Sequence, residues 1–98
     1  MDLSSEDHQF AADWLQDHCR AQPPDDTSLV WYVTASTLYT GVVNAAYAAN
    51  RRPISFNDLW GVLQIIFPNV RPTKLHQVPV YSGLQYHPNG LNSGVKFG

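Results

Sequence analysis

Cysteine, charge and long apolar runs are all scarce in this sequence, and each scarcity argues against a class of protein. The one cysteine, Cys19, has no second thiol for a disulfide and no Cys or His partner at metal-ligand spacing, so we expect a reducing compartment. No apolar run approaches the roughly 20 residues that span a bilayer. The first residues lack the regions of a secretion signal. We therefore expect neither a membrane protein nor a secreted one.

Charged residues make up only 14% of the 98 residues, whereas 44% are hydrophobic. This balance argues against general disorder and favours one small domain with a packed core and an unusually neutral surface. The few charges are segregated along the chain. Residues 1–50 hold seven carboxylates and one arginine, a net −6, and residues 51–98 hold five basic residues and one aspartate, a net +4. The basic half could therefore face an anionic partner.

Apolar periodicity predicts a first helix over residues 5–20, capped by Ser4 or Ser5. Its apolar stripe consists of Phe10, Ala11, Trp14, Leu15 and His18. The prolines and aspartates of residues 21–28 cannot continue a helix. The β-favouring run at residues 29–33 predicts a short strand after this break.

The same periodicity predicts a second helix that runs from Thr34 or Ser36, as its cap, to about Asn50. Its stripe is Leu38, Val42, Ala45, Ala46 and Ala49. The many alanines suggest close approach by a neighbouring helix. Gly41 costs this helix about 1 kcal/mol relative to alanine, so we expect it at a tight contact.

The third helix has the clearest local signature. Ser55 is its predicted cap, with Asp58 completing a capping box, and Ile54 and Leu59 are spaced as a hydrophobic staple. Pro68 stops the run. The predicted buried stripe is Phe56, Leu59, Trp60, Leu63, Ile66 and Phe67. The outward positions are Asn57, Gly61, Gln64 and Ile65.

After the third helix the pattern changes to extended segments. Residues 74–81 and 84–87 predict two strands of a hairpin, with Ser82-Gly83 as its turn. Pro79 should confine its strand to a sheet edge. Residues 88–98 are rich in Gly and Asn and predict a flexible tail.

Three helices followed by a hairpin predict an α+β, mainly α, fold of the winged-helix type over residues 1–87. In that architecture the third helix and the hairpin wing usually face DNA.

Three segments resemble, in order and nearly in spacing, the RFX-type winged-helix DNA-binding domain: "ADWLQDHC", "STLY" at 36–39, and "LWGVLQIIFPNVRPTKL" after Pro53. The resemblance covers roughly residues 10–86. The "FPN" after the third helix looks most like the divergent RFX-like domains of ARID-containing subunits of SWI/SNF-class chromatin remodellers. The resemblance implies a nuclear module of a transcription or chromatin-remodelling protein that binds DNA through the third helix and the wing.

Carried over by position, Arg71 and Lys74 match cationic positions of that family, and Tyr86 matches a wing tyrosine. The chain departs from the family where basic residues are usual. Gly61 and Gln64 stand on the exposed face of the third helix, and Thr73, Val78 and Ser82 stand at expected basic positions after it. These departures leave the expected fold intact and put sequence-specific binding in doubt.

The candidate DNA contacts lie in the basic half of the chain. They are Arg51, Arg52, Arg71, Lys74, His76, Asn57 and Gln64, with Tyr86 added by the resemblance. If the cations all faced one side they would neutralise about 3–4 phosphates, so binding to double-stranded DNA should be weak and salt-sensitive. Asn57 and Gln64 could pair with adenine edges.

Each candidate also has a plainer interpretation. The two amides suit a solvated helix face, and Arg71 and Lys74 suit a solvated loop. Cations such as Arg51 and Arg52 are favourable at a helix C-terminus without any ligand.

A second hypothesis is a degenerate winged helix that binds proteins within a nuclear complex. Its support is the neutral outward face at Gly61 and Gln64 and a surplus of aromatic residues, which is typical of interaction surfaces. These aromatics are Trp31, Tyr32, Tyr39, Tyr47, Trp60 and Tyr81.

Catalysis has little support. The four histidines are not at ligand spacing, and no nucleophile with a base, phosphate-binding glycine loop or buried carboxylate pair can be named. His18 on an apolar stripe is more often a satisfied core histidine. We expect no enzyme, no cofactor, no metal and no small-molecule substrate.

Overall fold

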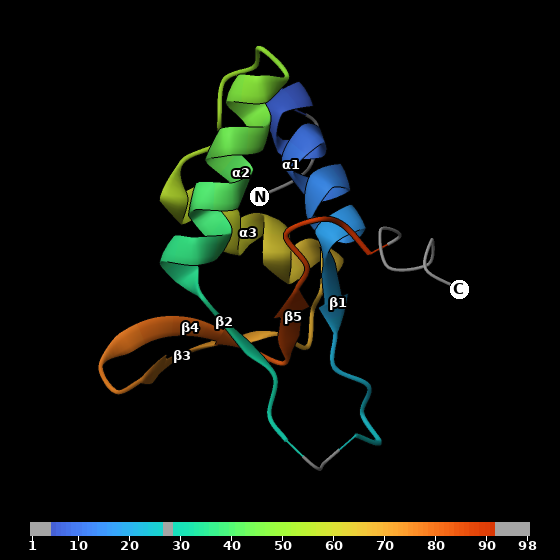
Figure 1. Cartoon of the computed structure of the whole chain (residues 1–98), viewed down its shortest axis with the longest axis vertical. Coiled ribbons are helices and arrows are strands. Elements are labelled where there is room, and N and C mark those ends of the chain that lie inside the picture. Colours follow the sequence, from blue (N-terminus) through green and yellow to red (C-terminus); the bar gives the residue numbers. More distant parts are fainter. Residues whose placement is uncertain (1–4, 27–28, 92–98) are drawn as a thin grey trace.

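The computed structural model describes residues 5–26 and 29–91, with three helices and five short strands (Figure 1). The helices are α1 (Glu6–His18), α2 (Ala35–Ala48) and α3 (Phe56–Ile66). The strands are β1 (Cys19–Ala21), β2 (Tyr32–Thr34), β3 (Arg71–Leu75), β4 (Val78–Ser82) and β5 (Leu84–Tyr86). Because the strands form two antiparallel sheets beside the helices, the expected α+β class is confirmed.

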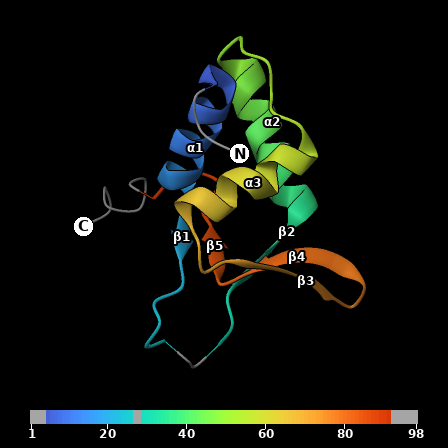
Figure 2. The same cartoon turned by 180° about the vertical axis from the view of Figure 1, so that it is seen from behind.

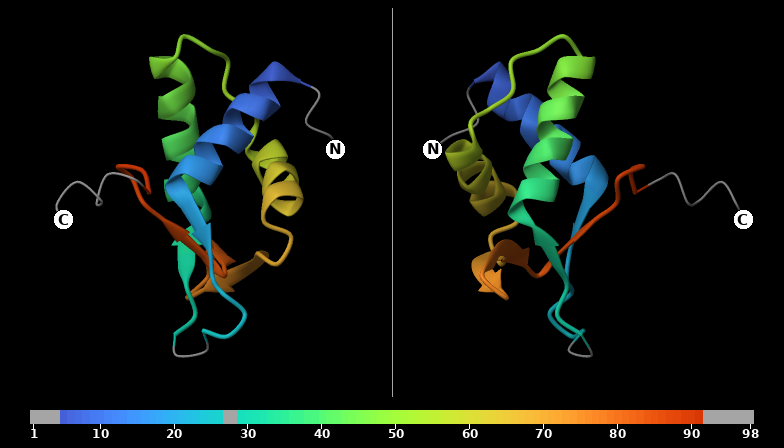
Figure 3. Two further views of the ribbon diagram at one scale, coloured as in Figure 1. Left: turned by 90° about the vertical axis from the view of Figure 1, so that its right-hand side faces the viewer. Right: turned by 60° about the vertical axis from the view of Figure 1, so that its left-hand side comes forward.

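The helices pack together at one end of the molecule and the strands lie below them (Figures 1 and 2). α1 packs across both α2 and α3 (Figure 3). The leucines with no exposed surface come from every helix and from β5: Leu15, Leu38, Leu59, Leu63 and Leu84. The core therefore joins the helices to the sheets, and each buried leucine contributes about 2 kcal/mol of hydrophobic stabilisation.

Side chains and backbone groups next to the helix ends fix where the helices begin and stop. The Thr34 side chain accepts a hydrogen bond from the Thr37 N–H, and the Ser55 side chain accepts one from the Asp58 N–H. At the end of α2, Asn50 has a φ of 56° and the Arg51 N–H donates to the Ala46 carbonyl at 2.8 Å, as in a Schellman motif. The predicted caps at Thr34, Ser55 and Asn50 are confirmed.

The buried face of α3 is narrower than the sequence pattern predicts. Leu59, Val62 and Leu63 are its buried residues, and they lie within one turn of one another. Phe56 was expected in the buried stripe but is 46% exposed, because it is the first residue of α3 and lies at the edge of the face that Leu59, Val62 and Leu63 bury. Its ring packs edge-on against Tyr39, with centroids 5.3 Å apart.

The hairpin prediction was wrong in its position. β3 and β4 pair with each other around His76 and Gln77, and β4 also pairs with β2, so the order of the three-stranded sheet is β2-β4-β3. Gly83 does have the expected positive φ, 81°, but it leads the chain out of β4 into β5. β5 then pairs with β1 in a second sheet, because the earlier strand 19–21 offers it a partner.

Pro79 does not lie on an edge strand as predicted, because β4 is the central strand of its sheet. The local reason for the prediction still holds, since proline has no N–H to donate to a ladder. β2 pairs only with residues 80–82 of β4, so Pro79 lies beyond the end of β2 and has a partner on β3 alone.

Part of the predicted tail is held against α1. The His87 N–H donates to the His18 carbonyl at 2.7 Å, and the Leu91 N–H donates to the Asp17 carbonyl at 2.8 Å. Gly90 turns between them with a φ of 90°. The rest of that predicted tail, residues 92–98, lies outside the described residues.

The β3–β4 turn contains stored backbone strain. His76 and Gln77 have φ of 52° and 68°, the positive values of a type I′ turn, in which glycine is strongly favoured at the second position. We expect Gln77→Gly to raise the free energy of unfolding by about 0.5–1 kcal/mol, because glycine adopts positive φ without steric cost. Urea unfolding followed by circular dichroism measures this change.

The matched control is Thr73→Gly in the neighbouring strand, where φ is negative. There glycine should destabilise the hairpin by about 0.5–1 kcal/mol. Equal effects of the two glycines would contradict the assignment of strain to Gln77.

Candidate nucleic-acid interface

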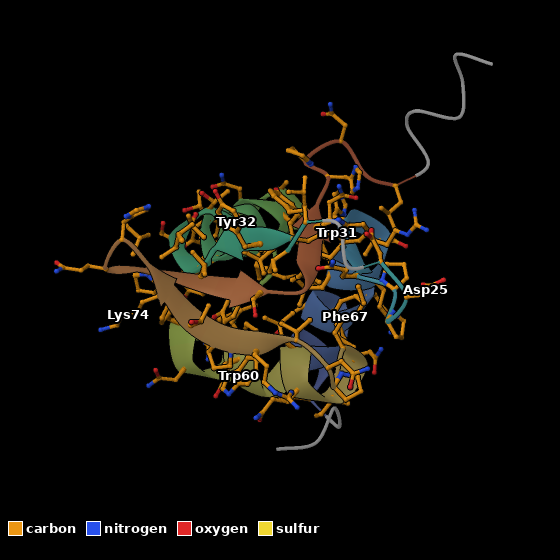
Figure 4. The ribbon with its side chains drawn as sticks, turned by 90° about the horizontal axis from the view of Figure 1, so that it is seen from below. Asp25, Trp31, Tyr32, Trp60, Phe67 and Lys74 are labelled. Atoms are coloured by element: carbon orange, nitrogen blue, oxygen red, sulfur yellow. The ribbon has the colours of Figure 1, made fainter. Side chains whose placement is uncertain are left out.

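α3 and strand β3 lie next to each other on one side of the molecule (Figures 2 and 4). Asn57 and Gln64 are exposed on α3, two helical turns apart and therefore on one face. All five residues of β3 are exposed. The structure thus places the outward face of α3 beside β3, whose side chains alternate between the two faces of the sheet.

Aromatic stacking fixes α3 against the hairpin. The Trp60 ring of α3 stacks on the Tyr81 ring of β4, with centroids 5.8 Å apart and planes 6° from parallel. Tyr81 is buried, and burial raises the pKa of its hydroxyl. Two further contacts hold the start of α3. The Tyr39 hydroxyl donates to the Ile54 carbonyl at 2.8 Å, and His8 Nε2 lies 2.9 Å from an Asp58 carboxylate oxygen.

The residues expected to contact DNA divide into groups. Lys74 and His76 are exposed on β3 and its turn, and neither side chain has a hydrogen-bond or ion-pair partner in residues 5–26 and 29–91. Arg71 is exposed at the start of β3, but its Nη1 donates to the Pro68 carbonyl at 2.9 Å and to the Val70 carbonyl at 3.3 Å. Arg71 therefore braces the loop after α3 and keeps its other guanidinium donors for a ligand.

The structure does not bring Arg51 to this side. Its guanidinium lies 3.9 Å from a Glu6 carboxylate oxygen, donates to the Glu6 carbonyl at 3.3 Å and stands 5.3 Å from the centre of the Phe10 ring. Arg52, which follows it, is exposed in the connection that leaves the end of α2 farthest from the strands (Figure 1). Arg51 is thus committed to α1, a contact that no local pattern could reveal.

Tyr86 lies outside the hairpin as well. It belongs to β5, and its ring packs against Trp14 with centroids 5.9 Å apart. Burial, together with a smaller effect of nearby Cys19, raises the pKa of the Tyr86 hydroxyl. Cys19 is itself buried, and burial raises the pKa of its thiol to about 12. These groups form part of the packing beneath α1.

The side formed by α3 and β3 has few negative charges, since Asp58 is the one acidic residue in the sequences of these two elements. The sequence has no Asp or Glu after Asp58, and the Asp58 carboxylate is paired with His8 of α1. The charge count predicted the scarcity of carboxylates after residue 58. The contact between Asp58 and His8 could not be predicted, because the two residues are fifty positions apart in the sequence.

Comparisons with known proteins give no match from which a function could be inferred. No family model matches the chain, and neither curated proteins nor solved structures give a match.

Neither a membrane-spanning helix nor a metal-binding cluster is found in residues 5–26 and 29–91. No helix there is long and apolar enough to cross a bilayer. The same residues contain no group of three or more His, Cys, Asp and Glu side chains that could hold a metal ion.

Proposed function

We propose that this chain is a winged-helix module that binds double-stranded DNA weakly, with α3 as the recognition helix and the β3–β4 hairpin as the wing. The element order supports it, since a strand, β2, lies between the first two helices and the hairpin follows the third. The sheet order β2-β4-β3 attaches that strand to the wing. The resemblance to RFX-type domains adds a nuclear location inside a larger transcription or chromatin-remodelling protein.

The observation that carries the proposal is the shared side of α3 and β3. Lys74 and His76 extend from the wing without a partner among the described residues, and Arg71 has guanidinium donors to spare. The sequence has no Asp or Glu after Asp58, and the Asp58 carboxylate lies at the start of α3, 2.9 Å from His8 Nε2 of α1. DNA phosphates are the anions that such a helix and wing would meet together.

The strength of binding follows from the number of free cations. With Arg51 committed to Glu6, about 2–3 phosphate contacts remain, fewer than the sequence suggested. The logarithm of the binding constant should then fall with the logarithm of salt with a slope of about −2. Asn57 and Gln64 offer amides that could pair with adenine, and Gly61 offers no side chain, so sequence preference should be slight.

Fluorescence anisotropy of a labelled duplex of about 25 base pairs tests this proposal across a salt series. We expect micromolar binding at low salt, and we expect Lys74→Ala to weaken it about 5-fold and to reduce the salt slope by about 1, as for one lost phosphate contact. The matched control is Arg20→Ala, which removes one positive charge from an exposed position of β1, in the other sheet.

The two variants have the same net charge, so a general charge effect would weaken both equally. Equal weakening would contradict a contact at the wing, and the absence of binding at low salt would rule out the DNA function.

A further inference from the structure

The three-stranded sheet has a second face that points away from α3. Successive side chains of a strand alternate between faces. Val33 and Tyr81, which are cross-strand partners, point into the core with the helices. Thr73, Val80 and Thr34, aligned across the three strands, point the other way. Val80 is buried yet is not part of the main core cluster, so it forms the floor of this other face.

That face contains a hollow of about 340 Å³. Its lining is Val30, Tyr32, Thr73, Lys74, Leu75, Val80 and Ser82. We call these residues, with Leu29 and Val78 beside them, the lower sheet face. Figure 4 shows this region from below, with Tyr32 and Lys74 labelled. Its apolar members are unusually exposed for their type, with Leu29 at 75% and Val30 at 71%.

The exposed aliphatic residues are held in place by hydrogen bonds. The Gln22 side-chain amide donates to the Leu29 carbonyl at 2.7 Å and to the Asp26 carbonyl at 2.8 Å, and its oxygen accepts from the Trp31 N–H at 2.9 Å. The Gly83 N–H donates to the Trp31 carbonyl at 2.7 Å. Val30 is therefore presented to solvent by a braced segment, which reduces the entropy that a binding partner must overcome.

Charge defines the kind of partner that fits. Lys74 lines the hollow, Arg71 stands on the same face by its register with Ser82, and His76 is in the adjoining turn. No residue after Asp58 is acidic. Asp25 lies at the opposite side of this view from Lys74 (Figure 4). An apolar hollow with cations at one end is complementary to an aliphatic side chain flanked by carboxylates.

The open edge of the sheet does not favour a partner that adds a strand. In the alternating ladder of this hairpin, the backbone groups of Pro72 and Lys74 face away from β4. Pro72 has no N–H to donate, so the edge offers few donors to a pairing strand. A partner would therefore lie over the face of the sheet and use side-chain contacts.

We propose that the lower sheet face binds an acidic segment of a partner protein, with an aliphatic or aromatic side chain in the hollow and carboxylates beside Lys74. The Thr73 and Ser82 hydroxyls would orient that segment through hydrogen bonds. This inference uses the face of the sheet opposite to the one that contacts α3. It shares Lys74 with the proposed DNA contacts, whereas Val30 and Val80 belong to the hollow alone.

Titration of the ¹³C-methyl-labelled full chain with synthetic peptides of twelve residues tests the proposal by NMR. In one set, a central pair of Leu, Ile, Val or Phe is flanked by Asp and Glu. There are three matched sets. In the first, Ser replaces the apolar pair. In the second, Asn and Gln replace the acidic residues, and in the third, Lys replaces them. We expect at least one acidic apolar peptide to bind with a Kd below about 1 mM and to shift the methyls of Val30, Leu75 and Val80. Its matched peptides should bind at least tenfold more weakly.

Val30→Ser should weaken the binding of the same peptide at least tenfold. It should leave the binding of duplex DNA, measured by anisotropy, unchanged. The control is Ile65→Ser on α3, which also replaces an exposed β-branched aliphatic side chain but lies outside the hollow. That control should leave peptide binding intact. The failure of DNA binding can therefore be told apart from the failure of peptide binding. Lys74→Ala should weaken the binding of both ligands, and Val30→Ser should weaken only the binding of the peptide.

Four results would overturn the proposal. The first is the absence of saturable shifts with every acidic peptide. The second is equal binding of the uncharged or basic sets, which would remove the charge argument. The third is a set of shifts at Val30 and Leu75 that depends on the concentration of the chain alone, which would assign the face to a second copy. The fourth is displacement of the peptide by duplex DNA with shifts of the same methyls, which would assign the face to nucleic acid.

Discussion

Replacement of Leu59 by alanine is expected to lower the free energy of unfolding by about 3 kcal/mol. Leu59 has no exposed surface and is part of the central cluster that unites all three helices. It also lies in the first turn of α3, just after the Ser55 cap, where α3 meets α1. Its removal would leave a cavity that the helices can fill only in part.

The control for Leu59→Ala is Ile65→Ala on the same helix. Both substitutions remove the same number of carbon atoms, but Ile65 is 43% exposed, so we expect a loss below about 1 kcal/mol. Urea unfolding of both variants measures the difference, provided that the free energy of unfolding falls with urea concentration with the same slope in each. Similar losses would mean that α3 is not anchored through Leu59. A domain of this size has about 5–15 kcal/mol of stability, so Leu59→Ala should remain folded at low temperature.

The second large effect is expected at Gly41 in the middle of α2. A Cβ atom at this position would lie 2.6 Å from the Tyr86 hydroxyl oxygen and 2.7 Å from Cη2 of Trp14. Valine adds two methyl groups beyond that Cβ, and its side chain is restricted to one main rotamer in a helix. We expect Gly41→Val to lower the free energy of unfolding by about 2–3 kcal/mol, because the rings must move out of packed positions. The predicted tight contact at Gly41 is thus confirmed.

Thr40→Val is the matched control for Gly41→Val, since it places the same β-branched side chain at the neighbouring, exposed position of α2. Its effect should be below about 0.5 kcal/mol. Thermal unfolding of both variants, with near-ultraviolet circular dichroism for the aromatic packing, measures the difference. An unchanged near-ultraviolet spectrum and melting temperature in Gly41→Val would show that Trp14 and Tyr86 do not contact α2 as described.

These packing contacts also explain how one small domain presents two separate surfaces. The Trp60–Tyr81 stack fixes α3 on one face of the three-stranded sheet, which leaves the other face to Val30, Tyr32 and Val80. Lys74 stands near the end of the hairpin and is accessible from both sides. A partner protein and DNA could therefore compete for its charge although their other contacts differ.

Much of the proposed DNA-binding side could be predicted from the sequence. The outward positions of Asn57 and Gln64 follow from the helical period, and both are exposed in the structure. The surplus of positive charge after Asp58 is a property of composition alone. By contrast, the partner of Arg51 and the position of Tyr86 could not be predicted, because Glu6 and Trp14 meet them from distant parts of the chain.

Three helices and most of their caps could be predicted from local sequence, because a cap depends on residues within about four positions of the helix end. Thr34, Ser55 and Asn50 act as predicted for this reason. The exception is the first helix, where Ser5 makes no side-chain cap hydrogen bond and the helix ends at His18, before the predicted residue 20.

The strands depend on long-range pairing. Ser82-Gly83 is a good local turn, yet the chain turns instead at His76 and Gln77, which must adopt positive φ. Pairing of β4 with β2 and of β5 with β1 joins residues far apart in sequence, and the free energy of that pairing outweighs the local preference of two turn residues.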